Sequence, residues 1–167
     1  MDKIYIGKIV STHGIKGELK IVSDFLYKDK VFKQKNKLII DNKEYEIKTY
    51  RRHKKYDMVT LDDYHNINEV LFLLKKPVYY EKDKLLLNDN EILDEDLIKF
   101  KVLTKDGKEG IIKEIFLASP TNKILRIELE KEILVPYNSP MILKIDKEKQ
   151  ELIIELIDKM EWLTIWK

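Results

Sequence analysis

Apolar and polar residues alternate in short runs along the first half of the chain, and this period of two is typical of β-strands with one buried face. The runs that predict strands are residues 3–10, 18–22, 38–40, 45–50, 58–61 and 78–80. Asp41 and Asn42 form a hairpin signal between two of them, and residues 51–56 form a longer connection. This half is therefore expected to fold as a small sheet.

One segment breaks the alternation and predicts a helix. Its apolar positions, spaced i, i+3, i+4 and i+7, are Ile67, Val70, Leu71 and Leu74. Asn66 can cap the helix, Glu69 stands three residues later as in a capping box, and Pro77 ends it. The first half is thus predicted to contain six strands and one helix.

The second half repeats the strand pattern after a charged, turn-prone segment at 81–96. Its predicted strands are residues 101–104, 110–117, 125–129, 134–137, 142–145 and 152–156, with a hairpin at 105–108. Short strands with turns every eight to twelve residues indicate small barrels. We expect an all-β chain of two small antiparallel β-barrels with one short helix: a first domain at 1–82, a linker at 83–96 and a second domain at 97–167.

Composition limits the classes of protein that the chain can belong to. Hydrophobic residues make up 44% and charged residues 37% of the 167 positions, which suits a globular fold with a charged surface. The sequence has no cysteine, no apolar signal region at its start and no apolar run that could cross a bilayer. These features predict a cytoplasmic protein without membrane contact.

The net charge of +2 conceals an asymmetry between the two halves. Residues 1–80 hold 17 Lys and Arg against 11 Asp and Glu, a formal +6, whereas residues 81–167 hold 15 against 19, a formal −4. Opposite charge on adjacent segments suggests different partners, with the basic half suited to a polyanion. The alternative is an uneven scatter of charge without functional meaning.

The stretch STHGIKGEL, at 11–19, places two glycines around a lysine and resembles a phosphate-binding loop. Such loops lead into a helix, however, whereas Gly17 is followed by the alternating residues of a strand. A tight turn between two strands is the better interpretation, because glycine adopts positive φ at little steric cost.

Two basic stretches of the first half are interleaved with aromatic residues. The first contains Phe25, Tyr27, Lys28, Lys30, Phe32, Lys33, Lys35 and Lys37. The second contains Tyr50, Arg51, Arg52, His53, Lys54, Lys55 and Tyr56. Cationic side chains bind phosphates and aromatic rings stack on unpaired bases, so the pair favours RNA binding over solvated loops around core aromatics.

Candidate catalytic residues are scarce. The three histidines, His13, His53 and His65, are far apart in sequence, so surface or turn positions are favoured over a metal site. The acidic run at 94–96 has no nucleophile nearby in sequence and is best interpreted as solvated or helix-starting charge. We expect no cofactor, no metal and no enzymatic activity.

The order of several motifs resembles the ribosome maturation factor RimM family. IGKIVSTHGIKGELKI, at 6–21, is similar to the opening of that family's N-terminal barrel, and NINEVL, at 66–71, to the start of its helix. DLI at 96–98, DG at 106–107, LVPY at 134–137 and KID at 144–146 follow in the order of its C-terminal PRC barrel. The resemblance implies an elongation-factor-like barrel followed by a PRC barrel.

The resemblance also implies a role. Members of the family are non-enzymatic factors that bind the maturing small (30S) ribosomal subunit, and the known partner is the nineteenth small-subunit ribosomal protein, held near the rRNA. We expect a monomer that assists small-subunit rRNA maturation. Contact with RNA or the ribosome is expected from His13, Lys16, Arg51, Arg52, Lys54 and Lys55.

Binding of the ribosomal protein is expected from an apolar patch with acidic residues beside it. Its residues are Ile92, Leu93, Asp94, Asp96, Pro136 and Tyr137. Ile92 and Leu93 stand where the family usually carries two tyrosines, so weaker binding is expected. Lys99 also replaces a glycine of the family. The alternative is that Ile92 and Leu93 belong to the core of the barrel or to the interface between the two barrels.

Two other functions compete with the adaptor. One is a stand-alone RNA-binding barrel protein without a ribosomal-protein partner. The other is a small hydrolase that uses Asp94 or Asp96.

Overall fold

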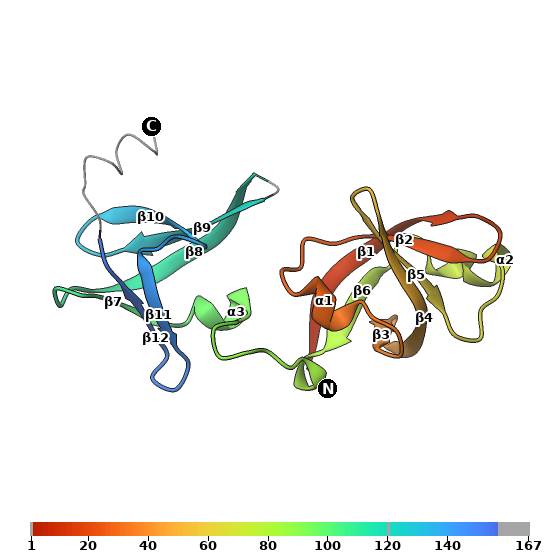
Figure 1. Ribbon diagram of the computed structural model, residues 1–167, viewed down its shortest axis with the longest axis horizontal. Coiled ribbons are helices and arrows are strands. Elements are labelled where there is room, and N and C mark those ends of the chain that lie inside the picture. The colour runs from red at the N-terminus through yellow and green to blue at the C-terminus, as the bar shows by residue number, and fades with distance from the viewer. Residues whose placement is uncertain (1, 120, 157–167) are drawn as a thin grey trace. The chain divides into compact units, whose positions relative to one another are not determined.

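The computed structural model describes residues 2–119 and 121–156, and the chain divides into two compact units, residues 1–86 and 87–167 (Figure 1). The predicted second domain extends to residue 167, so its last eleven positions, 157–167, lie outside the described residues. Within the described ranges, no helix is long and apolar enough to cross a membrane.

The first unit is a closed six-stranded barrel in the order β1-β2-β5-β4-β3-β6, with antiparallel pairing throughout. Its strands are β1 (Lys3–His13), β2 (Glu18–Val22), β3 (Lys37–Ile40), β4 (Lys43–His53), β5 (Tyr56–Leu61) and β6 (Pro77–Glu81). All six predicted strands are present. β1 and β4 extend three residues further than the pattern predicted, so that both end in a histidine.

Alternation of burial explains why these segments form a barrel. Leu19 and Ile21 on β2 are fully buried, while their neighbours Glu18 and Lys20 lie partly in solvent. Burial of each such apolar side chain stabilises the fold by about 1.5–3 kcal/mol. The barrel interior is filled in this way by one face of every strand, and the other face remains available for contacts.

The predicted helix is present but short. α2 (Ile67–Val70) makes one turn and continues as a 3₁₀ turn, η1 (Leu71–Leu73). The predicted cap is confirmed, because the Asn66 side chain accepts a 3.2 Å hydrogen bond from the Glu69 backbone N–H. The chain then joins the barrel, since the backbone N–H of Lys75 donates to the Ile9 carbonyl at 2.8 Å, and this contact ends the helix early.

Two further short elements in the first unit were not predicted. α1 (Lys28–Val31) lies within the first basic stretch and buries Val31, and the 3₁₀ turn η2 (Lys82–Lys84) follows β6. Neither has the length for a hydrophobic period, so the pattern of the sequence could not indicate them.

The second unit is a six-stranded sheet in the order β10-β9-β8-β7-β12-β11. Its strands are β7 (Lys101–Thr104), β8 (Glu109–Ser119), β9 (Asn122–Glu128), β10 (Glu132–Pro136), β11 (Ile142–Asp146) and β12 (Glu151–Ile154). The six predicted strands are again present. One pairing differs from an all-antiparallel arrangement, because β7 and β12 are parallel.

A short helix, α3 (Asp94–Leu97), precedes this sheet and covers part of its core. The core contains Leu97, Phe100, Val102, Leu125 and Val135, all at most 5% exposed. The acidic run at 94–96 therefore starts a helix, as the sequence indicated.

Candidate nucleic-acid interface

The turn between β1 and β2 is held in a fixed conformation. Gly14 and Gly17 both have positive φ, 71° and 84°, and strands flank them on both sides, which confirms the turn interpretation. A Cβ on Gly17 would lie 2.9 Å from the Asn66 carbonyl oxygen, so only glycine allows this approach. The Ile67 backbone N–H also donates to the Ile15 carbonyl at 2.9 Å. The start of α2 thereby supports the turn.

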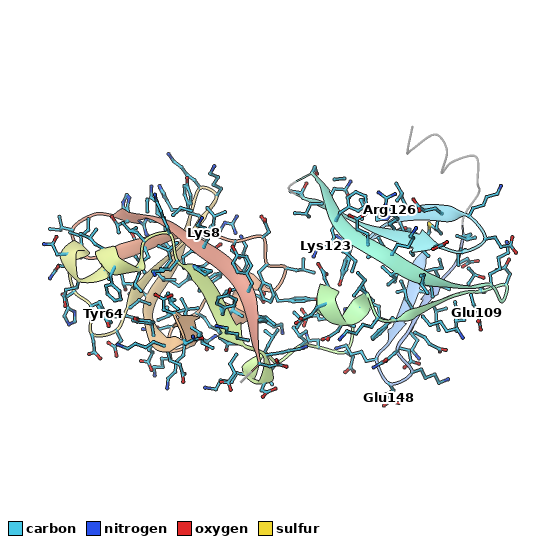
Figure 2. All side chains as sticks on the ribbon, turned by 180° about the vertical axis from the view of Figure 1, so that it is seen from behind. Lys8, Tyr64, Glu109, Lys123, Arg126 and Glu148 are labelled. Atoms are coloured by element: carbon cyan, nitrogen blue, oxygen red, sulfur yellow. The ribbon has the colours of Figure 1, made fainter. Side chains whose placement is uncertain are left out.

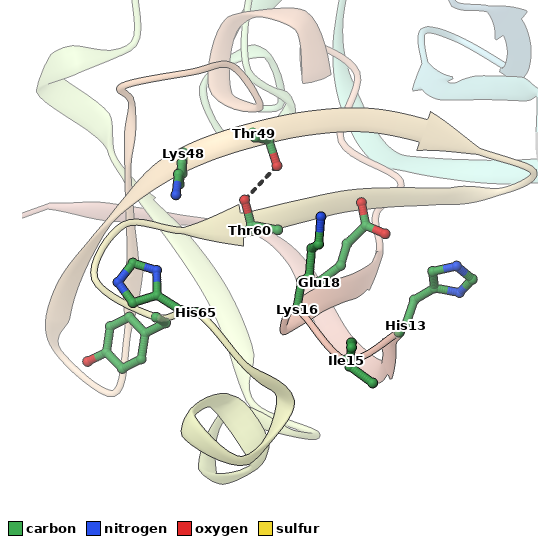
Figure 3. A pocket seen from close by; sticks show the side chains of 10 residues that line it. His13, Ile15, Lys16, Glu18, Lys48, Thr49, Thr60 and His65 are labelled. Carbon is green, nitrogen blue, oxygen red and sulfur yellow. Dashed lines mark hydrogen bonds between the residues drawn. The ribbon is translucent and has the colours of Figure 1, made fainter.

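An open groove of about 690 Å³ lies between this turn and the β4–β5 ladder (Figure 3). Figure 3 shows Lys48 on β4 and Thr60 on β5 on one side, and Ile15 and Lys16 from the turn on the other. The groove is lined by His13, Gly14, Ile15, Lys16, Glu18, Lys48, Thr49, Thr60, Tyr64 and His65. Below, "the groove" means this set of residues. Two of the predicted contact residues, His13 and Lys16, thus line one cavity.

Arg51 connects the groove to the β4–β5 hairpin. Its guanidinium forms a two-point contact with the Glu18 carboxylate, with Nε–Oε2 and Nη2–Oε1 distances of 2.8 and 2.7 Å. These hydrogen bonds lower the pKa of Glu18 and raise that of Arg51. Glu18 is the acidic side chain in the lining, and its charge is offset by Arg51. The remaining charged lining residues, Lys16 and Lys48, are cationic.

Two of the three histidines, His13 and His53, come close together at this end of the barrel, although they are distant in sequence. The rings of His13 and His53 have centroids 6.0 Å apart because β1 and β4 both extend to this end, and His65 lines the groove. Partial burial, followed by the charges of Arg51 and Lys54, lowers the pKa of His53. Among the described residues, no group of three or more potential ligands is arranged to hold a metal ion.

The tip of the β4–β5 hairpin presents the other predicted cations to solvent. Arg52, Lys54 and Lys55 are exposed, and Lys54 occupies the turn with a φ of 55°. The ammonium groups of Lys55 and Lys20 lie 5.5 and 5.1 Å from the centre of the Tyr56 ring. Cationic and aromatic groups therefore alternate on this surface, an arrangement that suits a nucleic acid.

A buried carboxylate, which the sequence analysis missed, joins the two basic stretches. Asp57 on β5 is fully buried; it accepts a 2.6 Å hydrogen bond from the Tyr50 hydroxyl and lies 3.0 Å from the Lys28 ammonium of α1. Burial and this hydrogen bond raise the pKa of Tyr50 to about 12. Phe32 stacks on Tyr50 with centroids 6.0 Å apart. The two stretches are thus connected to each other through buried contacts.

The aromatic residues of the first stretch are mostly structural. Tyr27 is 7% and Phe32 is 1% exposed, so these rings are not available to stack on bases. The only signal for Asp57 in the sequence is its acidic side chain beside the apolar residues Met58 and Val59, and this signal does not identify the partners of the carboxylate.

In the second unit, the residues predicted to bind a protein partner lie together, but two of them are inside. Ile92 is 4% and Leu93 is 7% exposed, and Ile92 belongs to the core cluster against which Tyr137 packs. Ile92 and Leu93 therefore lie in the interior of the second unit and do not form an exposed apolar patch. Burial of large apolar side chains against the core lowers the free energy of the folded state, because it removes apolar surface from water.

The neighbouring polar residues have partners within the unit. Asp94 on α3 forms a 2.8 Å ion pair with Lys123 on β9, and the Lys123 ammonium lies 5.4 Å from the centre of the Tyr137 ring. Pro136 ends β10 and, like Tyr137 and Asp96, is half-buried. On the same sheet, Arg126, which is labelled in Figure 2, contacts Glu114 and Glu132. The two distances are 3.0 and 2.6 Å.

Comparison with known proteins covers both units. The RimM N-terminal domain model matches residues 4–85, and the PRC-barrel domain model matches residues 89–160. The ribosome maturation factor RimM of Ligilactobacillus salivarius is 36% identical over 168 residues, which cover 96% of this chain and all of that protein. The RimM of Oceanobacillus iheyensis is 33% identical, with 95% and 96% covered.

Solved structures are more distant. A putative 16S ribosomal RNA processing protein RimM from Pseudomonas aeruginosa is 22% identical, with 93% of this chain and 98% of that chain covered and a TM-score of 0.45. The N-terminal domain of RimM from Thermus thermophilus is 17% identical, with 52% of this chain covered and a TM-score of 0.46.

Proposed function

Because this chain belongs to the RimM family of ribosome maturation factors, we propose that it is a cytoplasmic, non-enzymatic assembly factor of the small ribosomal subunit. The observation that carries the proposal is that the L. salivarius factor aligns with both units and over its whole length. A factor that shared only one barrel could have kept the fold and lost the function.

The first unit is proposed to contact rRNA. Support comes from the formal charge of +6 on residues 1–80 and from the exposed Arg52, Lys54 and Lys55 at the hairpin tip. Each phosphate that such a side chain neutralises releases counterions, which makes binding strongly dependent on salt. Arg51 has a second role in this proposal, because its contact with Glu18 orients the base of the hairpin against β2.

The second unit is proposed to bind the nineteenth small-subunit ribosomal protein. Ribosomal proteins are cationic, and residues 81–167 carry a formal charge of −4. Since Ile92 and Leu93 are buried, the apolar part of the contact is assigned to Ile98, which is 40% exposed directly after α3, and to the half-buried Tyr137. Asp96 on α3 lies between the buried pair and Ile98 in sequence and supplies negative charge to this contact.

Co-sedimentation tests the function. Purified chain should sediment with immature small subunits and remain unbound with mature ones. The double variant Lys54→Ala/Lys55→Ala should bind immature subunits more weakly than the parent and with a shallower dependence on salt, whereas Lys131→Ala/Lys149→Ala, which removes the same charge from exposed positions of the second unit, should bind like the parent. Equal binding to mature and immature subunits would contradict the proposal.

A stand-alone RNA-binding barrel remains the second candidate, because the basic surface of the first unit would serve it equally well. A titration with the purified nineteenth ribosomal protein separates the two functions: saturable binding that is lost in Ile98→Ser supports the adaptor, and no binding supports the stand-alone protein. The hydrolase has no comparable support, since Asp94 is already paired with Lys123.

A further inference from the structure

We propose that the groove of the first unit binds an unpaired stretch of RNA, with a phosphate held between Lys16 and Lys48 and a base placed against Tyr64. This inference rests on the proposed contact with rRNA and specifies which form of RNA the barrel selects. The site is distinct from the hairpin tip, where the cations of Arg52, Lys54 and Lys55 are exposed to solvent.

Charge in the groove favours an anion. Lys16 and Lys48 line it from opposite sides, and both are exposed (Figure 3). Within the described parts of the chain, neither ammonium has a hydrogen bond or an ion pair. Glu18 is the acidic residue of the lining, and Arg51 offsets its charge through two hydrogen bonds. A phosphate entering the groove therefore meets two available cations.

An aromatic ring stands at the same cavity. Tyr64 lines the groove and contacts two other rings, with centroid distances of 5.7 Å to Tyr45 and 6.3 Å to Phe72. Tyr45 is buried, whereas Phe72 is 54% exposed. A ring fixed in this way loses little conformational freedom when a base stacks on it, and such stacking is sequence-tolerant. The combination of cations and a positioned ring indicates a nucleotide.

The groove is preformed, which is the condition for selecting a ligand by shape. Close approach of Gly17 to the Asn66 carbonyl and the hydrogen bond from Ile67 to Ile15 fix the turn that forms one side. The antiparallel pairing of β4 with β5 forms the other side. Ile15 belongs to the turn and is 81% exposed, so its apolar side chain is available to a sugar or base.

Unpaired RNA fits these features better than a duplex. In a double helix the bases are stacked on each other and cannot reach a ring inside a cavity, and recognition is limited to phosphates and 2′-hydroxyls. A ring that sits beside the phosphate-binding lysines can contribute only when a base is free. We therefore expect the groove to distinguish single strands from duplexes, and the hairpin tip to bind both.

Fluorescence anisotropy with the full chain tests this. The probes are a labelled twelve-nucleotide uridine strand and a twelve-base-pair RNA duplex of the same label. Tyr64→Leu should weaken binding of the single strand by about 5- to 150-fold, the range for loss of one stacked base, and leave duplex binding within about twofold. Lys16→Gln/Lys48→Gln should reduce the slope of log K against log salt for the single strand by about 1.4.

The hairpin variant Lys54→Ala/Lys55→Ala is the matched control, because it removes two cations from outside the groove and should weaken both probes alike. If Tyr64→Leu melts early, Lys16→Gln/Lys48→Gln decides the test, since these exposed side chains do not pack in the core. Three outcomes would overturn the inference. They are equal losses of affinity for single-stranded and duplex RNA in Tyr64→Leu, an unchanged salt slope in Lys16→Gln/Lys48→Gln, and displacement of the single-stranded RNA by polyglutamate at equal charge concentration.

The outcome can be separated from that of the proposed function. A chain that sediments with immature subunits but does not distinguish strand from duplex refutes the groove and leaves the assembly role. Selective binding of single strands without co-sedimentation supports the groove and refutes the assembly role.

Discussion

Removal of the Lys28 side chain should destabilise the first unit far more than removal of any neighbouring lysine. The Lys28 ammonium lies 3.0 Å from Asp57, whose side chain has no exposed area. Lys28→Ala therefore leaves a carboxylate in the interior without its nearest cation, although it retains the hydrogen bond from Tyr50 and the Arg52 guanidinium at 3.7 Å.

The size of the loss can be worked from these distances. Breaking a buried ion pair by deleting one partner costs about 3–5 kcal/mol. The Lys28 side chain is 20% exposed, and Arg52 and Tyr50 remain, so about 2 kcal/mol is expected. In a domain of this size, 1 kcal/mol lowers the melting temperature by about 4–8 °C, which gives a decrease of about 8–16 °C.

Differential scanning calorimetry of the full chain measures the change, and hydrogen exchange of residues 43–61 identifies the transition that belongs to the first unit. Lys33→Ala is the matched control: Lys33 is exposed in the same basic stretch, and its loss changes the charge of the chain equally. If the two variants melt within about 2 °C of each other, the Lys28–Asp57 pair does not stabilise the barrel and the reasoning is refuted.

Three further results are expected. Limited proteolysis should cut first within 83–96, the proposed linker, where Leu86 is 80% exposed, and a first cut inside a strand would contradict that boundary. Ile92→Ser/Leu93→Ser should lower the free energy of unfolding of the second unit by about 4 kcal/mol or more in urea, and an unchanged midpoint would contradict their burial. The pKa of His53 is lower in the folded state than its ordinary value of 6.5, so the folded state binds the proton less readily than the unfolded state. The free energy of unfolding should therefore be highest above pH 6.5 and should decline as the pH falls to 5.5. This decline, followed by urea unfolding, should be shallower in His53→Gln, and parallel curves would show that His53 contributes nothing.

Local features of the chain were readable because they depend on neighbouring residues. Alternation of apolar and polar positions predicted the twelve strands. The spacing of Asn66 and Glu69 predicted the helix cap, and the two glycines at 14 and 17 predicted the turn. The charge difference between the halves follows from composition alone. Together with the order of the motifs, these features were sufficient to identify the family and two β-rich units.

The candidate site depended on closure of the barrel, which no local pattern encodes. Pairing of β1 with β2, of β2 with β5 and of β4 with β5 brings Glu18 to Arg51 and His13 to His53, residues that are 33 and 40 positions apart. The same closure buries Asp57 under Lys28. Side-chain burial depends on what packs against a residue from elsewhere in the chain. The sequence therefore could not decide whether Ile92 and Leu93 lie in an exposed patch or in the interior, and the tertiary structure shows that they are buried.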